Sequence, residues 1–137
     1  MNTKVYYPAI FTKDENGYFV QFIDFKEAFT EGETIEEAFE MAKDVLYLVI
    51  LDYIDNLPKP TEEYKNLDSD SFISIIELDI EEYAKSISQK TINTTVTMKE
   101  ELKYIADKMN VNYSQLLQNS IRREIQKNIA ISKKNIV

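Results

Sequence analysis

Short apolar segments separated by turns fill most of the first 80 residues. Residues 4–11 and 18–23 mix β-branched and aromatic residues, which favour strands. Between them lies Asn16-Gly17, a dipeptide preferred in hairpin turns because both central residues of such a turn take a positive φ. Residues 28–30 predict a third short strand, and residues 72–80 predict a later one. The pattern therefore predicts a sheet that begins with a hairpin.

One longer segment, beginning at residue 35, has the spacing of an amphipathic helix. Thr34 and Glu37 form a capping box, in which each side chain accepts a hydrogen bond from a backbone N–H of the first turn. Pro58 and Pro60 mark the end of the helix because proline cannot continue it. Glu36, Glu40, Lys43 and Asp44 lie outside a single apolar stripe that is expected to face the sheet: Ile35, Ala38, Phe39, Ala42, Val45, Leu46, Val49 and Tyr53. Residues 1–80 thus predict the order β-β-β-α-β.

The pattern changes after residue 90. Residues 91–98 alternate as a strand does, with Ile92, Thr94, Val96 and Met98 on one face and Thr91, Asn93, Thr95 and Thr97 on the other. Residues 99–109 predict a helix whose inward positions are Leu102, Ile105, Ala106 and Met109, and Asn112 is a suitable cap for a second helix. One strand and two short helices cannot enclose a core alone. We therefore expect two copies to pair their strands into a ribbon, a shape that fits the major groove of DNA.

Charge also divides the chain. Residues 1–88 hold seven lysines and 20 acidic residues, a net charge of −13, and residues 89–137 hold nine basic and four acidic residues, a net charge of +5. Such an asymmetry indicates two surfaces with different partners; the alternative for the acidic half is that its charge serves only solubility. The patterns together predict an acidic domain at 1–80, a linker at 81–89, a basic module at 90–128 and a tail at 129–137 that frays.

Composition excludes several classes of chemistry. The chain has no cysteine and no histidine, so disulfides, the usual zinc sites and catalysis with a histidine base are ruled out. Two glycines provide no phosphate-binding loop. The first residues lack the pattern of a signal peptide, and the longest apolar run, Val45–Ile54, is too short to span a bilayer. We expect a cytoplasmic protein without a membrane segment.

Residues 90–127 resemble the ribbon-helix-helix family of DNA-binding proteins. The alternating segment is followed by Met98-Lys-Glu-Glu-Leu102 and then by the polar helix start Asn112-Tyr113-Ser114. The resemblance implies that Asn93, Thr95 and Thr97 read base edges of double-stranded DNA. It also implies phosphate contacts from Lys90 and from the backbone at Asn112, Tyr113 and Ser114. The alternative is a dimerisation module whose polar ribbon does not touch DNA.

The acidic domain is similar to the N-terminal domain of HicB antitoxins. The shared pattern comprises Tyr7–Phe11, Asp14–Val20, Phe22–Phe25, Phe29–Ala38 and Pro58–Thr61, in that order. The chain departs from the family at Ile23, where relatives often have proline, and within the loop that follows it. The resemblance implies an α+β protein, with a partial RNase H-like β-β-β-α-β domain followed by the ribbon-helix-helix domain.

The resemblance also implies a function in a type II toxin–antitoxin system. The antitoxin binds and neutralises a HicA-type toxin, a small basic ribonuclease, and represses its own operon by binding operator DNA as a dimer or higher oligomer. We expect the toxin contacts at Asp24, Phe25, Glu27 and Phe29, although the two phenylalanines also suit a core. No cofactor, metal or catalytic residue is implied.

Two alternatives remain at this stage. An RNase H-like fold raises the possibility of a nuclease, for which Asp14, Asp24, Glu31 and Glu33 are the available carboxylates. Acidic residues are so common here that chance alone supplies such candidates, and we expect no enzyme activity. The other alternative is a free-standing transcriptional regulator whose acidic domain senses a small molecule.

Overall fold

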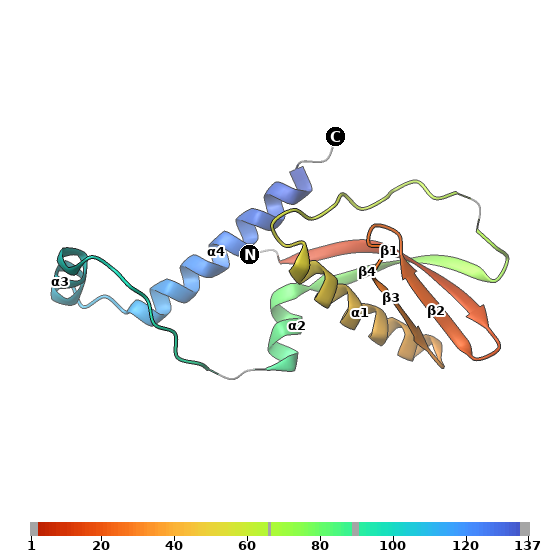
Figure 1. The fold of residues 1–137 in the computed structure, drawn as a ribbon, viewed down its shortest axis with the longest axis horizontal. Helices are drawn as coiled ribbons and strands as arrows, with labels where there is room; N and C mark the ends of the chain where they lie inside the picture. Colours follow the sequence, from red (N-terminus) through yellow and green to blue (C-terminus); the bar gives the residue numbers. More distant parts are fainter. Residues whose placement is uncertain (1–2, 66, 89–90, 135–137) are drawn as a thin grey trace.

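One antiparallel sheet of four strands forms the centre of the N-terminal part of the molecule (Figure 1). The structure is a computed structural model that describes residues 3–65, 67–88 and 91–134. The strands lie in the order β3-β2-β1-β4 and have these bounds: β1 Lys4–Asp14, β2 Gly17–Phe22, β3 Phe29–Gly32 and β4 Ser71–Asp79. The predicted order β-β-β-α-β is confirmed.

The β1–β2 hairpin closes at the predicted Asn16-Gly17 turn. Asp14 pairs with Gly17, and the Asp14 carboxylate accepts a hydrogen bond of 2.8 Å from the Asn16 backbone N–H. Gly17 has a φ of +135°, a conformation that other residues rarely adopt. A Cβ atom at Gly17 would lie 2.3 Å from the carbonyl oxygen of Gly32, so the hairpin and the end of β3 fit together only with glycine here.

Helix α1 (Ile35–Asp52) covers one face of the sheet (Figure 1). Its start is the predicted cap, since the Thr34 hydroxyl accepts a hydrogen bond of 3.1 Å from the Glu37 N–H. The residues that α1 buries are Ala38, Ala42, Leu46, Val49 and Ile50. Burying one large apolar side chain contributes roughly 1.5–3 kcal/mol, so this helical face is a major source of stability. Tyr53 was predicted within the stripe but is 40% exposed, because the helix ends at Asp52.

Aromatic rings connect the sheet to α1. Phe11 of β1 is fully buried and stacks on Phe39 of α1 at 4.6 Å and on Phe72 of β4 at 5.0 Å between ring centroids. On the face turned toward α1, the register places Tyr7 opposite Ile76. Both residues are buried. The strands therefore alternate as expected, with one face packed under α1.

Helix α2 (Ile80–Ile87) occupies most of the predicted linker at 81–89. It forms because Asp79 is an effective N-cap: its carboxylate accepts hydrogen bonds from the Glu82 N–H at 3.2 Å and the Thr3 hydroxyl at 2.5 Å. Tyr83 then packs on Tyr47 of α1 at 4.6 Å between ring centroids. This segment is thus a packed element rather than a spacer.

The C-terminal part forms an arm that carries helices α3 (Glu100–Lys108) and α4 (Tyr113–Lys134), with α3 far from the sheet (Figure 1). The predicted strand at 91–98 is wrong for the single chain, in which residues 91–99 belong to no helix or strand. An isolated extended segment has no neighbour for its backbone hydrogen bonds, and the predicted ribbon takes its second strand from another copy. Among the described residues, no helix is long and apolar enough to span a membrane.

Helix α4 is longer than the sequence indicated and returns toward the sheet (Figure 1). The tail predicted to fray at 129–137 instead continues the helix to Lys134, and its last part, 135–137, lies outside the described residues. Ile129 is only 1% exposed within the N-terminal core. Arg122 adds a 2.9 Å ion pair with Glu81 of α2. The correction has a clear cause, because an apolar position on the last turns of α4 meets the apolar core of the first domain.

Candidate functional site

Residues 91–99 run beside the start of α4 and border a hollow of about 440 Å³. The three residues of this segment that line it belong to the face predicted to be apolar: Thr94, Val96 and Met98. On the α4 side the apolar lining comes from Leu116 and Leu117. The alternating segment thus directs one face toward the helices, as a ribbon strand would.

The basic module has exposed apolar residues where a folded domain has a core. None of the residues of α3 is buried, and its predicted inward residues Leu102 and Ile105 are 58% and 54% exposed. Val96 and Ile121 are 52% and 49% exposed. So large an apolar surface on a short module is typical of a protein–protein interface. In the single chain, the inward positions of the sequence analysis still lack the surface that would cover them.

The residues predicted to read DNA lie on the opposite face of the extended segment. Asn93, Thr95 and Thr97 are exposed, and none of them lines the hollow beside α4. Lys90, which was predicted to contact phosphate, lies outside the residues that the structure describes. The three polar side chains are therefore available for an external partner.

The start of α4 is built around Asn112, Tyr113 and Ser114. The Asn112 side chain accepts a hydrogen bond of 3.0 Å from the Gln115 N–H, which confirms the predicted cap. The Tyr113 hydroxyl donates to the Asp107 carboxylate and so ties the start of α4 to the end of α3. Exposed Ser114 lines the hollow. The first N–H groups of a helix attract anions, and here this end of α4 lies beside the extended segment 91–99.

Asp107 also forms an ion pair within α3. Its carboxylate lies 2.8 Å from the Lys103 ammonium group. Hydrogen bonds from Lys103 and Tyr113 lower the pKa of Asp107, and the bond to Asp107 raises the pKa of Lys103. Lys103 is thus held on α3 by an internal partner, whereas Lys99 is exposed at the start of that helix.

In the acidic domain, Asp24 holds the chain that follows α1. Its carboxylate accepts hydrogen bonds from the Thr61 hydroxyl at 2.6 Å and the Thr61 N–H at 3.1 Å. Tyr7 donates from its hydroxyl to the Pro58 carbonyl at 2.7 Å. Burial raises the pKa of Tyr7, and the nearby Asp24 carboxylate raises it further. Asp24 therefore has a structural role in the free chain.

Phe25 does not belong to an exposed contact surface. It is 2% exposed, and its ring lies 4.8 Å from the Tyr7 ring and 5.5 Å from the Tyr53 ring. Phe25 is therefore a core residue, and the prediction that it contacts the toxin is wrong. The turn after β2 directs this ring inward, so that a partner cannot reach it without opening the domain.

Glu27 and Phe29 are both exposed. A hydrogen bond from the Tyr53 hydroxyl lowers the pKa of Glu27, and Tyr53 lies at the end of α1. Phe29 is 55% exposed, and its ring centroid lies 6.2 Å from that of Phe19. Both rings lie on the sheet face turned away from α1. Phe19 lies in a predicted strand but is not among the predicted contact residues. Alternation with buried Val20 was the signal that placed Phe19 on the outer face.

Three of the four candidate nuclease carboxylates line one hollow near the hairpin. Asp14, Glu31 and Glu33 border this space of about 470 Å³, whereas Asp24 is engaged elsewhere with Thr61. Within the described ranges, no group of three or more acidic side chains has the arrangement of a metal site. The hollow is thus a concentration of negative charge at one end of α1.

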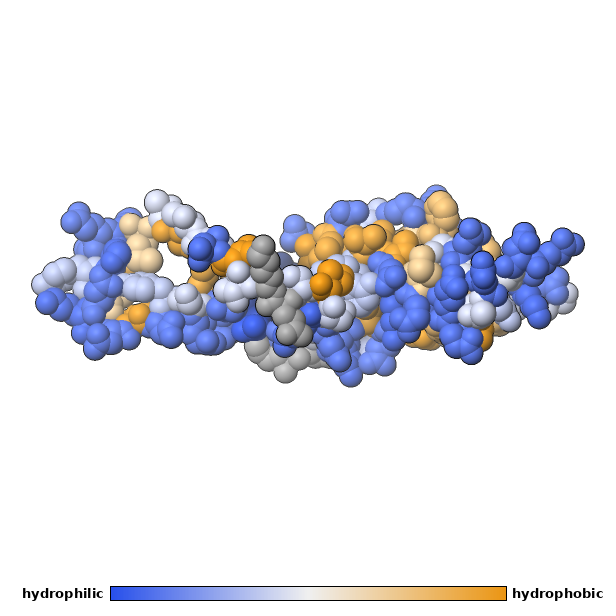
Figure 2. Space-filling view, turned by 90° about the horizontal axis from the view of Figure 1, so that it is seen from below, coloured by the Kyte–Doolittle hydropathy of each residue, from blue (hydrophilic) through white to orange (hydrophobic). Residues whose placement is uncertain are grey.

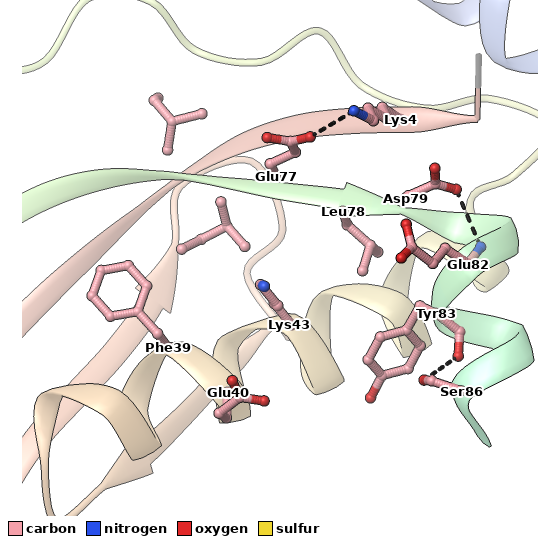
Figure 3. A pocket seen from close by; sticks show the side chains of 12 residues that line it. Lys4, Phe39, Glu40, Lys43, Glu77, Leu78, Asp79, Glu82, Tyr83 and Ser86 are labelled. Atoms are coloured by element: carbon pink, nitrogen blue, oxygen red, sulfur yellow. Dashed lines mark hydrogen bonds and ion pairs between the residues drawn. The ribbon is translucent and has the colours of Figure 1, made fainter.

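A larger hollow of about 550 Å³ opens between α1, β4 and α2 (Figure 3). Phe39 and Leu78 form part of its apolar wall, and Lys43 points into it from α1 (Figure 3). At its rim the Lys4 ammonium group pairs with the Glu77 carboxylate at 3.2 Å. Because charges of both signs surround this open space, it does not select a particular class of small molecule.

Residues 6–85 match the family described as "HicB_like antitoxin of bacterial toxin-antitoxin system". The chain belongs to this HicB-like antitoxin family. The matched range includes the whole sheet from Tyr6 onward, α1 and most of α2, so the family assignment rests on the complete acidic domain.

Relatives and solved structures agree with this assignment. The chain is 39% identical over 75 residues to "Antitoxin HicB" of Escherichia coli (strain K12), which covers 50% of this chain and 51% of that protein. It is 39% identical over 64 residues to "Antitoxin HicB 2" of Photorhabdus laumondii, covering 44% and 46%. The chain thus spans about half the length of these curated relatives.

A structural comparison extends further along the chain. One chain of the solved "Toxin-Antitoxin complex from Streptococcus pneumoniae" superposes with a TM-score of 0.52 and 29% sequence identity, covering 88% of this chain and 99% of that chain. This coverage exceeds the acidic domain, so the arm also has a counterpart in that structure. The mixed α+β architecture is therefore shared with a toxin–antitoxin protein.

Proposed function

We propose that this HicB-type antitoxin neutralises a HicA-type ribonuclease toxin through its acidic domain and represses its own operon through its basic module. The observation that carries the proposal is the family match over residues 6–85, together with the similarity to a chain of a toxin–antitoxin complex. In this proposal the protein acts by binding and is not an enzyme.

The charge distribution supports capture of a basic toxin. Residues 1–88 carry a net charge of −13, from seven lysines and 20 acidic residues, which attracts a positively charged ribonuclease and speeds the encounter. Glu27 and Phe29 remain the contacts that we propose from the first set. Asp24 supports the same surface indirectly by fixing the loop at Thr61, and buried Phe25 is left out.

The basic module supports binding to operator DNA as a dimer. A second copy would cover the exposed apolar residues of α3 and the hollow beside α4, and the two extended segments would pair as an antiparallel ribbon. Asn93, Thr95 and Thr97 would then project from the ribbon into the major groove, where asparagine pairs well with adenine and threonine contacts a methyl group or a base edge.

Co-expression tests the proposal directly. The small gene beside the one for this chain is expressed with it, and the tagged antitoxin is purified from the cells. The neighbouring product is also expressed alone and growth is measured. We expect a basic protein to co-purify and to arrest growth by itself. If no partner co-purifies and the neighbour is harmless, the antitoxin function is wrong.

A gel-shift titration with the promoter region separates the remaining alternatives. We expect binding that weakens steeply as salt rises, because phosphate contacts release counterions. Toxin binding without any promoter binding would mean that the basic module serves only for dimerisation. Promoter binding without a toxin would instead favour the free-standing regulator.

A further inference from the structure

The outer face of α1 exposes a second apolar stripe that the single-stripe prediction did not include. Met41, Leu48 and Leu51 are 38%, 63% and 45% exposed on this face. With Glu37 and Asp44 they follow one another at intervals of four, three, four and three residues, which is the spacing of one helix face. Seen from below the sheet, hydrophobic side chains gather over the helical layer in the middle of the molecule (Figure 2).

Only acidic charges accompany this stripe on α1. Glu37, Asp44 and Asp52 are exposed beside the apolar residues. The single lysine of α1, Lys43, points instead into the hollow under β4 (Figure 3). Asp44 is fixed in place because its carboxylate accepts a hydrogen bond from the Tyr83 hydroxyl. The α1 outer face, defined by these three acidic and three apolar residues, is therefore apolar along its length and negative at its borders.

Both ends of the α1 outer face continue into features already described. Met41 and Glu37 line the acidic hollow of about 470 Å³ at the N-terminal end of the helix, together with Glu33 and its neighbours. At the other end, Tyr53 hydrogen-bonds to Glu27. The apolar stripe thus connects a negative hollow to a proposed toxin contact.

We propose that the α1 outer face is the main docking surface for the toxin, an inference that rests on the proposed antitoxin function. The complementary partner is a basic protein that lays an apolar ridge over Met41, Leu48 and Leu51. A lysine or arginine of that protein occupies the acidic hollow at the start of α1, where it meets carboxylates from α1 and from the segment around β3.

The negative charge of the α1 outer face favours a basic protein over other partners. A second copy of the same face would bring Glu37, Asp44 and Asp52 against identical carboxylates, and like charges across an interface disfavour association. Nucleic acid and anionic lipid are repelled for the same reason. A positively charged protein with an exposed apolar ridge is the class of partner that satisfies both features of the face.

The test uses the full-length chain and the product of the neighbouring gene, purified as an inactive variant. Leu48→Ala combined with Leu51→Ala removes two of the three apolar side chains of the stripe, and the control is Ile75→Ala. Ile75 is 51% exposed and lies on the face of the sheet turned away from α1, since its neighbour Ile76 is buried under α1. It belongs to β4, at the other edge of the sheet from β3 and the proposed contact Phe29. Isothermal titration calorimetry gives the dissociation constants, and thermal melting confirms that each variant is folded.

We expect the double variant to bind the toxin at least about tenfold more weakly and the Ile75 variant to bind as the parent does, because central apolar contacts dominate interface affinity. Glu37→Gln with Asp52→Asn should slow association and reduce its salt dependence.

Unchanged toxin affinity in the Leu48/Leu51 variant would overturn the inference while leaving the antitoxin function standing. If that variant also changes its oligomeric state, the face is assigned to contacts between copies. If the parent chain itself binds no toxin, the inference and the proposed function both fail.

Discussion

Hydrogen-bonded carboxylates organise the acidic domain at two positions. Asp24 fixes the segment after α1 through Thr61, and Asp79 caps α2 while it anchors Thr3 at the start of the chain. Each carboxylate therefore joins residues that are distant in sequence. These two acidic side chains are therefore structural, even in a domain where solvated charges are abundant.

Replacing Asp24 with alanine should loosen the loop at Thr61. We expect the free energy of unfolding to fall by about 1.5–3 kcal/mol, the range for hydrogen bonds to a charged group. Urea titration measures the change, with exposed Asp55→Ala as the control, which should stay within about 0.5 kcal/mol of the parent. An unchanged stability would mean that Asp24 serves mainly an external partner.

Asp79 should make the stability depend on pH in the acidic range. The hydrogen bond from Thr3 lowers the pKa of Asp79 below its usual 3.8, so the folded protein holds its proton less tightly than the unfolded chain. Its contribution is thus present above pH 3.8 and is lost as the pH falls through the lower, folded-state value. Urea unfolding of the parent and of Asp79→Asn should therefore differ at neutral pH and converge in acid. A constant difference across pH would contradict this account.

Two phenylalanines show what sequence reasoning could and could not decide about the site. Phe25 and Phe29 stand four residues apart and look equivalent in the sequence. One is 2% exposed and the other 55%, because Phe25 lies in a turn that folds it under the domain, while Phe29 starts β3 on the outer sheet face. The conformation of that turn was not encoded in a recognisable motif, so the sequence alone could not decide which of the two rings is exposed.

At the scale of elements, local patterns predicted the hairpin, α1 and the caps, and they failed where an element depends on a distant partner. The Asn16-Gly17 turn and the Thr34 and Asn112 caps are short-range signals, and each was found. Residues 91–98 carry a clear strand pattern but lack the second strand that would complete it. Helix α4 is held in part by the ion pair of Arg122 with Glu81, 41 positions earlier in the chain, which no local pattern reveals.

Helix α4 has apolar positions for two different surfaces. Leu116 and Leu117 line the open hollow near its start, whereas Ile129 is buried against the first domain. We expect Ile129→Ala to reduce the free energy of unfolding of the full chain by about 2–5 kcal/mol, the usual cost of emptying a buried isoleucine site. The matched control is Ile87→Ala at a position that is 62% exposed. Equal stability of the two variants in urea would show that the end of α4 is not docked.

At the scale of the whole molecule, the two parts differ in what holds them together. The acidic domain has a core of its own, while the basic module exposes the residues that would form one. We expect Val96→Asp to prevent self-association, because it places a charge in the predicted dimer interface. Sedimentation velocity at several concentrations should show the parent as a dimer or larger and the variant as a monomer. A parent chain that stays monomeric would contradict the ribbon.

The division of charge and packing between the two parts predicts that their functions can be separated. Asn93 and Thr95 are exposed on the face of the extended segment turned away from α4, so their replacement by alanine removes the proposed base contacts without disturbing the core of the acidic domain. We expect the free energy of operator binding to become about 2–6 kcal/mol less favourable in the double variant. Each good base contact contributes about 1–3 kcal/mol of discrimination. Toxin affinity should not change, because the acidic surface lies on another domain. Gel shifts and calorimetry on the same preparation measure both properties.

Unaltered operator affinity would remove these residues from the DNA contact, and a parallel loss of toxin binding would show that the two domains act as one unit.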